Sequence, residues 1–371
     1  MVYIHSPSVT IQHVTIRDLA SVSNMCVNYP MWISTNTLVM ESMQILNMVS
    51  VIRIMTIDQW DITQDSSITL TNVTLSNNDA LETPNGVFHI NYAKATITIT
   101  GLTLSNNTVS APTLYAGIAS GNLTMTESHF LDNIMILSGS NAFLSLVFAN
   151  VSEGAVYIAN ITSHYNSYNA TDLYTLLDKP VLAAICSATT SCILEDLNLE
   201  GDSVALITQP LSTGNIVRNV MIHNSTTGGV QLYINQSHVD VTNVNVRDTS
   251  RRFGAGIAVQ IQDGGSVNMT DIYMHNLTTK SGGNCFHFWQ GSDGFYYLRN
   301  TTCSTTRFVS GDAINVGGVG LAGPALSRST ITAVDTHWYD MQSGPVGAID
   351  LELADGSQFQ MEDSTFNQSN S

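Results

Sequence analysis

Residues 68–77 read ITLTNVTLSN and residues 239–248 read VDVTNVNVRD. Both stretches follow the pattern apolar-x-apolar-x-Asx-apolar-x-apolar-x-Asx, where Asx is Asn or Asp. Thirteen copies of this ten-residue pattern occur in the 371-residue chain, at a mean spacing of about 29 residues. The copies begin at Val9, Leu38, Ile68, Ile97, Leu123, Val156, Cys192, Asn215, Val239, Val267, Tyr296, Ile331 and Phe359. A repeat of this length indicates a solenoid, in which each repeat packs on its neighbours.

Three positions of the pattern are apolar along almost the whole chain. Counting from zero, position two is apolar in all thirteen copies, position zero fails only at Asn215, and position seven fails only at Ser163. Apolar residues that alternate with polar ones are typical of a half-buried strand. We therefore expect positions zero, two and seven to point into one core.

Asn or Asp occupies position four in nine copies and position nine in nine copies, as at Asn72 and Asn77. These residues tolerate the left-handed backbone conformation of a sharp bend. A third alternating strand follows the second bend, for example GVQLYIN at 229–235 and GIAVQIQ at 256–262. Three strands and three corners therefore make one coil.

Stacked coils of this kind resemble the right-handed parallel β-helix, the architecture of the pectin-lyase-like superfamily and of many adhesins and tailspikes. The resemblance covers nearly the whole chain. It implies an all-β fold of about 13 coils, with three parallel sheets around one interior, and a single domain over residues 1–371. A leucine-rich-repeat solenoid is the main alternative, but the pattern LxxLxLxxN is absent. Architecture alone does not specify activity.

The repeat starts close to Met1, no secretion signal is visible, and the last copy runs to the end of the chain. A stack without caps exposes unpaired strand edges that can pair with another chain. We therefore expect this chain to be part of a longer protein, or its protomers to stack end to end.

The chain is acidic, with a formal net charge of −17 and only 12 Lys plus Arg residues. Nucleic-acid binding requires a basic surface, so it is not expected. The closest basic residues, Arg247, Arg251 and Arg252, are predicted to lie in a solvated turn. No apolar run is long enough to span a bilayer. We expect an extracellular or cell-surface location.

Five cysteines leave at least one unpaired within the chain. Cys186 and Cys192 enclose a short loop and can form a disulfide or remain two thiols. Cys285 and Cys303 lie on neighbouring coils and can bridge them, which leaves Cys26. Their spacing matches no zinc motif, and we expect no metal and no cofactor.

Asn-x-Ser/Thr sequons, the acceptor motif for N-glycosylation, occur twelve times. The acceptors are Asn72, Asn106, Asn122, Asn150, Asn160, Asn169, Asn224, Asn235, Asn268, Asn276, Asn300 and Asn367. Part of this number follows from the corner pattern, because Thr often follows a corner Asn at the next outward position. Exposed sequons are expected to carry glycans in a secretory eukaryote.

Aligning the third strands places several outward residues in or beside one column. They are Tyr233, Gln260, His287, Asn315 and Asp350, with Trp289 and Glu352 next to them. Aromatic rings beside amides and carboxylates bind sugars, which makes four of these residues glycan-binding candidates. The four are Tyr233, Gln260, Trp289 and Asn315.

The same column contains a catalytic alternative, since enzymes of the superfamily use carboxylates on the outer faces of neighbouring coils. Asp350 and Glu352 lie two residues apart on one strand face, roughly 6 to 7 Å, which is near the range for an inverting glycosidase pair. His287 would complete the group. The motifs typical of polygalacturonases, NTD, DD, GHG and RxK, are absent.

The segment 58–65, DQWDITQD, has three carboxylates, Asp58, Asp61 and Asp65, that could bind calcium. Their spacing is not that of an EF-hand. A solvated loop is the favoured interpretation.

Taken together, these features predict a non-catalytic extracellular structural protein, a glycosylated β-helical rod that assembles into a fibre or surface layer. Its partners would be further copies of itself and glycans. A carbohydrate-binding adhesin, or a polysaccharide-active enzyme that uses His287, Asp350 and Glu352, is the alternative.

Overall fold

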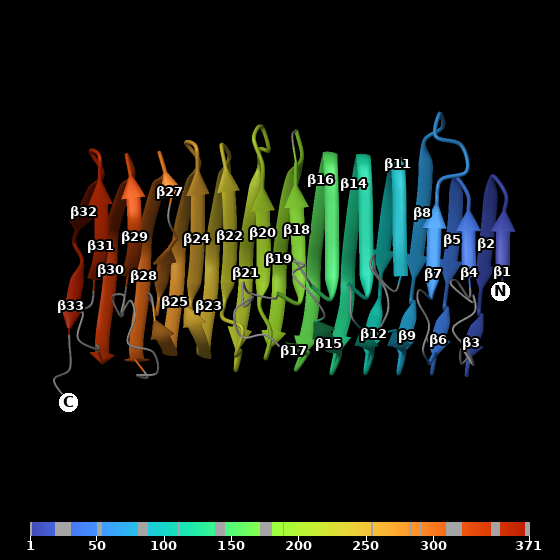
Figure 1. Ribbon diagram of the computed structural model, residues 1–371, viewed down its shortest axis with the longest axis horizontal. Helices are drawn as coiled ribbons and strands as arrows, with labels where there is room; N and C mark the ends of the chain where they lie inside the picture. Colours follow the sequence, from blue (N-terminus) through green and yellow to red (C-terminus); the bar gives the residue numbers. More distant parts are fainter. Residues whose placement is uncertain are drawn as a thin grey trace. The chain divides into compact units, whose positions relative to one another are not determined.

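The computed structural model describes residues 2–18, 31–49, 54–80, 88–109, 112–137, 145–170, 180–187, 189–253, 255–281, 284–289, 291–308, 321–342 and 349–367. Within these ranges the regular secondary structure consists of β-strands alone, and paired strands run parallel (Figure 1). The expected all-β solenoid of parallel strands is confirmed. Contacts between Cα atoms divide the chain into two compact units, Met1–Thr190 and Ser191–Ser371. A single domain over 1–371 stays a prediction.

The first unit is built from columns of strands that pair from one coil to the next. The first column contains β2 (Ser8–Gln12), β5 (Thr37–Glu41), β8 (Ser66–Thr71), β11 (Phe88–Thr100), β14 (Leu114–Leu131) and β16 (Val147–His164). The second contains β3 (Thr15–Arg17), β6 (Gln44–Leu46), β9 (Thr74–Ser76), β12 (Thr103–Ser105) and the later parts of β14 and β16.

The third column of this unit contains β1 (Val2–His5), β4 (Met31–Ser34), β7 (Met55–Asp58), the first parts of β11, β14 and β16, and β18 (Leu182–Cys186). A short fourth column contains β10 (Asp79–Ala80), β13 (Thr108–Val109), β15 (Ile134–Leu137) and β17 (Ser167–Ala170). The first unit therefore has the three strands per coil that the sequence predicts, and a small additional sheet.

In the second unit, the first two strands of a coil form one long bent strand, except in the last coil, where they are separate. These are β19 (Ser191–Glu200), β21 (Asn215–His223), β23 (His238–Phe253), β25 (Ser266–Ser281), β28 (Phe295–Phe308) and β30 (Thr330–Gln342), followed by β32 (Gln358–Glu362) and β33 (Thr365–Asn367). The third-strand column contains β20 (Val204–Thr208), β22 (Val230–Asn235), β24 (Ile257–Gln262), β26 (Phe286–Phe288), β27 (Gly291–Ser292), β29 (Leu321–Ser327) and β31 (Ile349–Ala354).

The corner prediction is confirmed at every copy of the repeat. All thirteen position-four residues have a left-handed backbone, with φ between 47° and 70°, including the copies without Asx. They are His13, Ser42, Asn72, Gly101, Glu127, Asn160, Asp196, Asn219, Asn243, Asp271, Asn300, Asp335 and Asp363. Position nine is left-handed as well in the twelve copies where it is described, as at Asn77 and Asp248. The bend is therefore set by the place in the coil, and Asx is the residue that accepts it at least cost.

The predicted inward columns form the core. Leu70 at position two and Leu75 at position seven are fully buried. The two exceptions to the apolar pattern are buried too, but they are hydrogen bonded. Asn215 accepts a bond from the Cys192 amide (3.2 Å) and donates to the His238 carbonyl (3.0 Å). The Ser163 hydroxyl accepts a bond from the Asn166 amide group at 2.8 Å.

A ladder of buried asparagines runs through the first unit at position ten, one residue after the second corner. Asn78 donates from Nδ2 to Oδ1 of Asn107 at 2.8 Å, Asn107 donates to Asn133 at 2.8 Å, and Asn133 donates to Asn166 at 2.6 Å. Each amide group also bonds to a backbone carbonyl, for example that of Leu75 at 2.9 Å. The ladder therefore satisfies buried polar groups at consecutive corners and joins the coils.

Candidate functional site

The candidate site lies on the outer face of the third-strand column in the second unit. Parallel pairing of β22 with β24 places Tyr233 beside Gln260. Trp289, directly after β26, continues this column because its backbone N–H donates to the Val259 carbonyl at 2.8 Å. The structure thus brings together three of the four residues predicted to bind glycans. The fourth, Asn315, lies outside the described residues.

His287 and Asp350 do not share that column. His287 pairs with Ala258, two residues before Gln260, and Ala322 lies between His287 and Asp350. The sequence analysis placed His287 in or beside the column of Gln260, whereas in the structure His287 pairs two residues earlier on β24. The reason is that the segments between the second corner and the third strand differ in length from coil to coil. Two strand spacings separate the imidazole from the Asp350 carboxyl, on the order of 10 Å.

A hollow of about 160 Å³ opens on this face. Tyr233 and Gln260 line it, together with Asn235, Gln262, Gln209 and Thr208. These residues are neutral. The hollow therefore suits a neutral polar ligand, which could form hydrogen bonds with the amides and contact one aromatic ring, better than it suits an ion. Burial raises the pKa of the Tyr233 hydroxyl, which keeps it protonated.

His287 is buried, with 3 % of its surface exposed. Its ring lies edge-on to that of Trp289, with 4.4 Å between centroids. Burial and the charge of Arg251 lower the pKa of His287 to about 4. The imidazole is therefore neutral at physiological pH.

For Arg251, the environment predicted from the sequence is wrong. It was expected in a solvated turn, but it is only 9 % exposed, and burial lowers its pKa to about 9. Arg247 lies in β23, directly before the Asp248 corner, and is exposed.

The two carboxylates of the catalytic alternative lie on β31. Asp350 is half-buried and Glu352 is exposed. Burial and the neighbouring charge of Glu352 raise the pKa of Asp350. The pair is present as expected, but His287 is remote from it.

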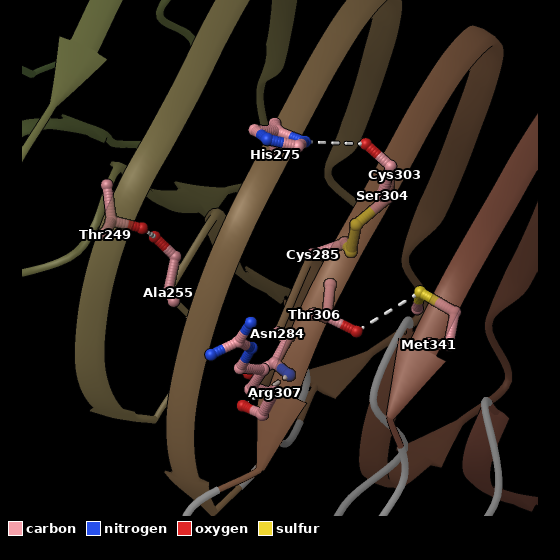
Figure 2. Close-up of a disulfide and its surroundings, with 10 residues drawn as sticks. All are labelled: Thr249, Ala255, His275, Asn284, Cys285, Cys303, Ser304, Thr306, Arg307 and Met341. Atoms are coloured by element: carbon pink, nitrogen blue, oxygen red, sulfur yellow. Dashed lines mark hydrogen bonds between the residues drawn. A yellow bond between two sulfur atoms is a disulfide. The ribbon is translucent and has the colours of Figure 1, made fainter. Parts of the chain in front are cut away.

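Cys285 and Cys303 form a disulfide in the second unit, with 6.2 Å between their Cα atoms (Figure 2). Both residues are fully buried. Beside the bridge, Asn284 donates to the carbonyl oxygen of Arg307 at 3.2 Å. Cys186 and Cys192 are each disulfide-bonded as well, and Cys26 lies outside the described residues.

The three carboxylates of segment 58–65 each have a different protein partner. Asp58 accepts a bond from the Trp32 indole at 2.8 Å, Asp61 accepts bonds from Thr63, and Asp65 pairs with Lys94 at 2.5 Å. In the described part of the chain, no cluster of three or more His, Cys, Asp or Glu residues is arranged to hold a metal ion.

Most of the sequon asparagines are accessible. Exposed acceptors are Asn72, Asn106, Asn122, Asn160, Asn224, Asn268, Asn300 and Asn367. Half-buried acceptors are Asn150, Asn235 and Asn276. Asn169 lies in β17, and its side chain is outside the description. No helix among the described residues is long and apolar enough to cross a membrane.

Comparison with known proteins found no matching family model, no matching curated protein and no matching solved structure. Function therefore has to be inferred from the chain's own residues.

Proposed function

We propose that this chain is a non-catalytic extracellular structural protein, a glycosylated β-helical rod that assembles into a fibre or a surface layer. The observation that carries this proposal is the display of eight exposed sequon asparagines on a scaffold of stacked parallel coils. The buried asparagine ladder and the Cys285–Cys303 disulfide support it, since both hold neighbouring coils in one register.

The resemblance to non-catalytic surface and adhesin members of the pectin-lyase-like superfamily is part of this proposal. Self-association end to end follows from general strand chemistry. A stack of parallel strands presents unpaired N–H and C=O groups on its terminal coil, and a second copy can pair with them. The net charge of −17 opposes nonspecific clumping.

The test is electron microscopy of the protein from its native source, with intact-mass analysis of the same sample. We expect filaments, and a mass well above the 40.1 kDa of the chain. Strictly monomeric particles of unmodified mass at high protein concentration would contradict both parts of the proposal.

Carbohydrate binding is the second candidate, because Tyr233 and Gln260 line a neutral hollow and Trp289 extends the same column. Protein made in bacteria, which carries no N-glycan, should then bind neutral oligosaccharides, and Tyr233→Ala should abolish the binding. Binding that survives this change would exclude the hollow. The polysaccharide-active alternative is less well supported, since His287 is buried and two coils away from Asp350.

A further inference from the structure

Two of the twelve sequons differ from the rest in the residue two places before the acceptor. In β16 Phe148 precedes Asn150, and in β22 Tyr233 precedes Asn235. At the other ten sequons this residue is aliphatic, Met, Ser or Thr. For a corner acceptor such as Asn72 it is an inward position, here Leu70, which is buried. An aromatic ring therefore stands two places before the acceptor, on the acceptor's own strand, at these two sequons.

The spacing matters because residues i and i+2 of a strand project from the same face, roughly 6.6 Å apart. A sugar attached to Nδ2 of Asn235 would thus lie beside the ring of Tyr233. Sugar rings present C–H groups on their faces, and an aromatic ring is a favourable surface for them.

At Asn235 the structure also shows a place for such a sugar. Asn235 and Tyr233 both line the hollow of about 160 Å³. Gln260 and Gln262 contribute amide groups to the same hollow, and amides can both donate to and accept from hydroxyls.

The amide oxygen of the acceptor is the second observation at this site. Oδ1 of Asn235 is buried, with no hydrogen-bond partner among the described residues. A buried amide oxygen without a donor is costly. The first sugar of an N-glycan, N-acetylglucosamine, supplies hydroxyl and acetamido N–H donors next to this oxygen.

We propose that Asn235 carries an N-glycan whose first sugar packs on Tyr233 and fills the hollow. This inference rests on the proposed function, because it requires passage through a secretory pathway. Ser237, the third residue of the sequon, is 9 % exposed, and its hydroxyl contacts that of Thr208 at 2.5 Å. Its burial is no obstacle, since glycans are added before the chain folds. The glycan would then be a structural part of the second unit.

The first experiment is site-by-site glycopeptide mass spectrometry of the chain secreted from a eukaryotic cell. We expect Asn235 to be occupied in nearly all molecules. Occupancy at other sequons with Asn235 empty would overturn this inference and leave the proposed function standing. No occupancy at any sequon would overturn both.

The second experiment measures the melting temperature of the secreted protein. Trimming each glycan to its first sugar should leave the melting temperature unchanged, whereas Asn235→Gln should lower it by about 2–4 °C. Tyr233→Ala should cause a similar loss, and the double variant should lose no more than either single one.

The matched control is Asn122→Gln. Asn122 is an exposed sequon acceptor in β14, with Ser120 two places before it, so its substitution should not change the melting temperature. In bacterial protein, which has no glycan, Tyr233→Ala should lower the melting temperature less than in the secreted protein. Equal losses in both preparations, or additive losses in the double variant, would overturn the packing of sugar on Tyr233.

Discussion

At the scale of single residues, burial decides which side chains are chemically unusual. His287 and Arg251 are both almost inaccessible to water, and burial lowers the pKa of each. Tyr296 is buried as well, and its hydroxyl pKa is raised by burial. The sequence pattern treats His287 and Arg251 as outward or corner residues, whereas Tyr296 occupies the inward position zero of its copy.

The neutral state of His287 predicts a dependence of stability on pH. Its folded pKa of about 4 lies below the value of about 6.5 expected for an unfolded histidine. Between these values the unfolded state binds more protons, so stability falls as pH decreases from about 6.5 to about 4, by at most about 3 kcal/mol. Urea unfolding at pH 7.5, 5.5 and 4.5 measures the loss.

The comparison that isolates His287 is His287→Gln, which removes the titrating ring. This variant should lose less stability than the natural chain over the same pH range. His129→Gln, at an exposed position, should lose as much stability as the natural chain over this pH range. If His287→Gln and the natural chain lose equal stability, the buried neutral imidazole is not responsible.

The inward columns are tested by Leu70→Asp. Leu70 is fully buried, so the new carboxylate would have no water and no partner, and we expect destabilisation by about 4 kcal/mol or more. Thr69→Asp, one residue away on the outer face, should change stability by less than about 1 kcal/mol. Circular dichroism melting of both variants distinguishes them. A normally stable Leu70→Asp variant would show that the register of the coil is wrong.

At the scale of elements, the strands are joined by corners, and the corners are joined to one another by side chains. Asn107 is 1 % exposed and lies at the centre of the buried ladder. Its Oδ1 accepts bonds from Nδ2 and from the backbone N–H of Asn78. Its Nδ2 donates to Asn133 and to the Leu75 carbonyl.

Removing this amide should therefore be costly. Asn107→Ala leaves several buried groups without partners, and we expect a loss of about 2–4 kcal/mol in the free energy of unfolding. The neighbouring corner residue Asn106 is exposed, and Asn106→Gly keeps the left-handed backbone, so it should cost less than about 1 kcal/mol. Urea unfolding of both variants measures the difference. Similar losses would mean that the ladder adds nothing beyond the corner itself.

Between the third and first strands, glycines on consecutive coils allow the two backbones to approach closely. Gly154 in β16 has a φ of 132°, and a Cβ there would collide with the carbonyl oxygen of Gly121 on the previous coil. Gly264 also has a positive φ, 93°, but no atom lies within 4 Å of its Cβ position. Gly154→Ala should therefore destabilise the protein by at least about 2 kcal/mol more than Gly264→Ala. Thermal melting of the two variants checks this, and equal losses would contradict close approach of the two coils.

At the scale of the whole molecule, charge is the dominant property. The net charge of −17 comes from 29 acidic residues against 12 Lys plus Arg. Many of the acidic residues are corner residues, such as Asp248 and Asp271, and Asn276 and Asn300 donate hydrogen bonds to these two carboxylates at 2.6 Å. Among the described residues, 12 acidic side chains stand at left-handed bends, so part of the negative charge is carried by residues that also bend the chain.

This charge predicts how association depends on pH. Mutual repulsion should suppress nonspecific clumping near pH 7 and disappear near the isoelectric point of about 4.6. Light scattering of the unglycosylated chain should rise reversibly as pH approaches that value. An unchanged signal from pH 7 to pH 4.6 would show that charge does not control association.

The sequence by itself determined the coil, its core and its corners. Alternation and a left-handed bend are local properties, so position two and position four could be identified without knowing any neighbour, and Leu70 and Asn72 lie as predicted. The buried asparagine ladder could also have been predicted from the sequence, since SNN recurs at 76–78 and 105–107.

Only the tertiary structure decided which outward residues meet. The segments before the third strands vary in length, so the local pattern does not specify the register there, and His287 falls beside Ala258 instead of Gln260. The hollow beside Tyr233 is lined by residues of three neighbouring coils, and the burial of Arg251 likewise depends on the folded chain. Contacts between coils depend on residues about 29 positions apart, and a single repeat contains no information about them.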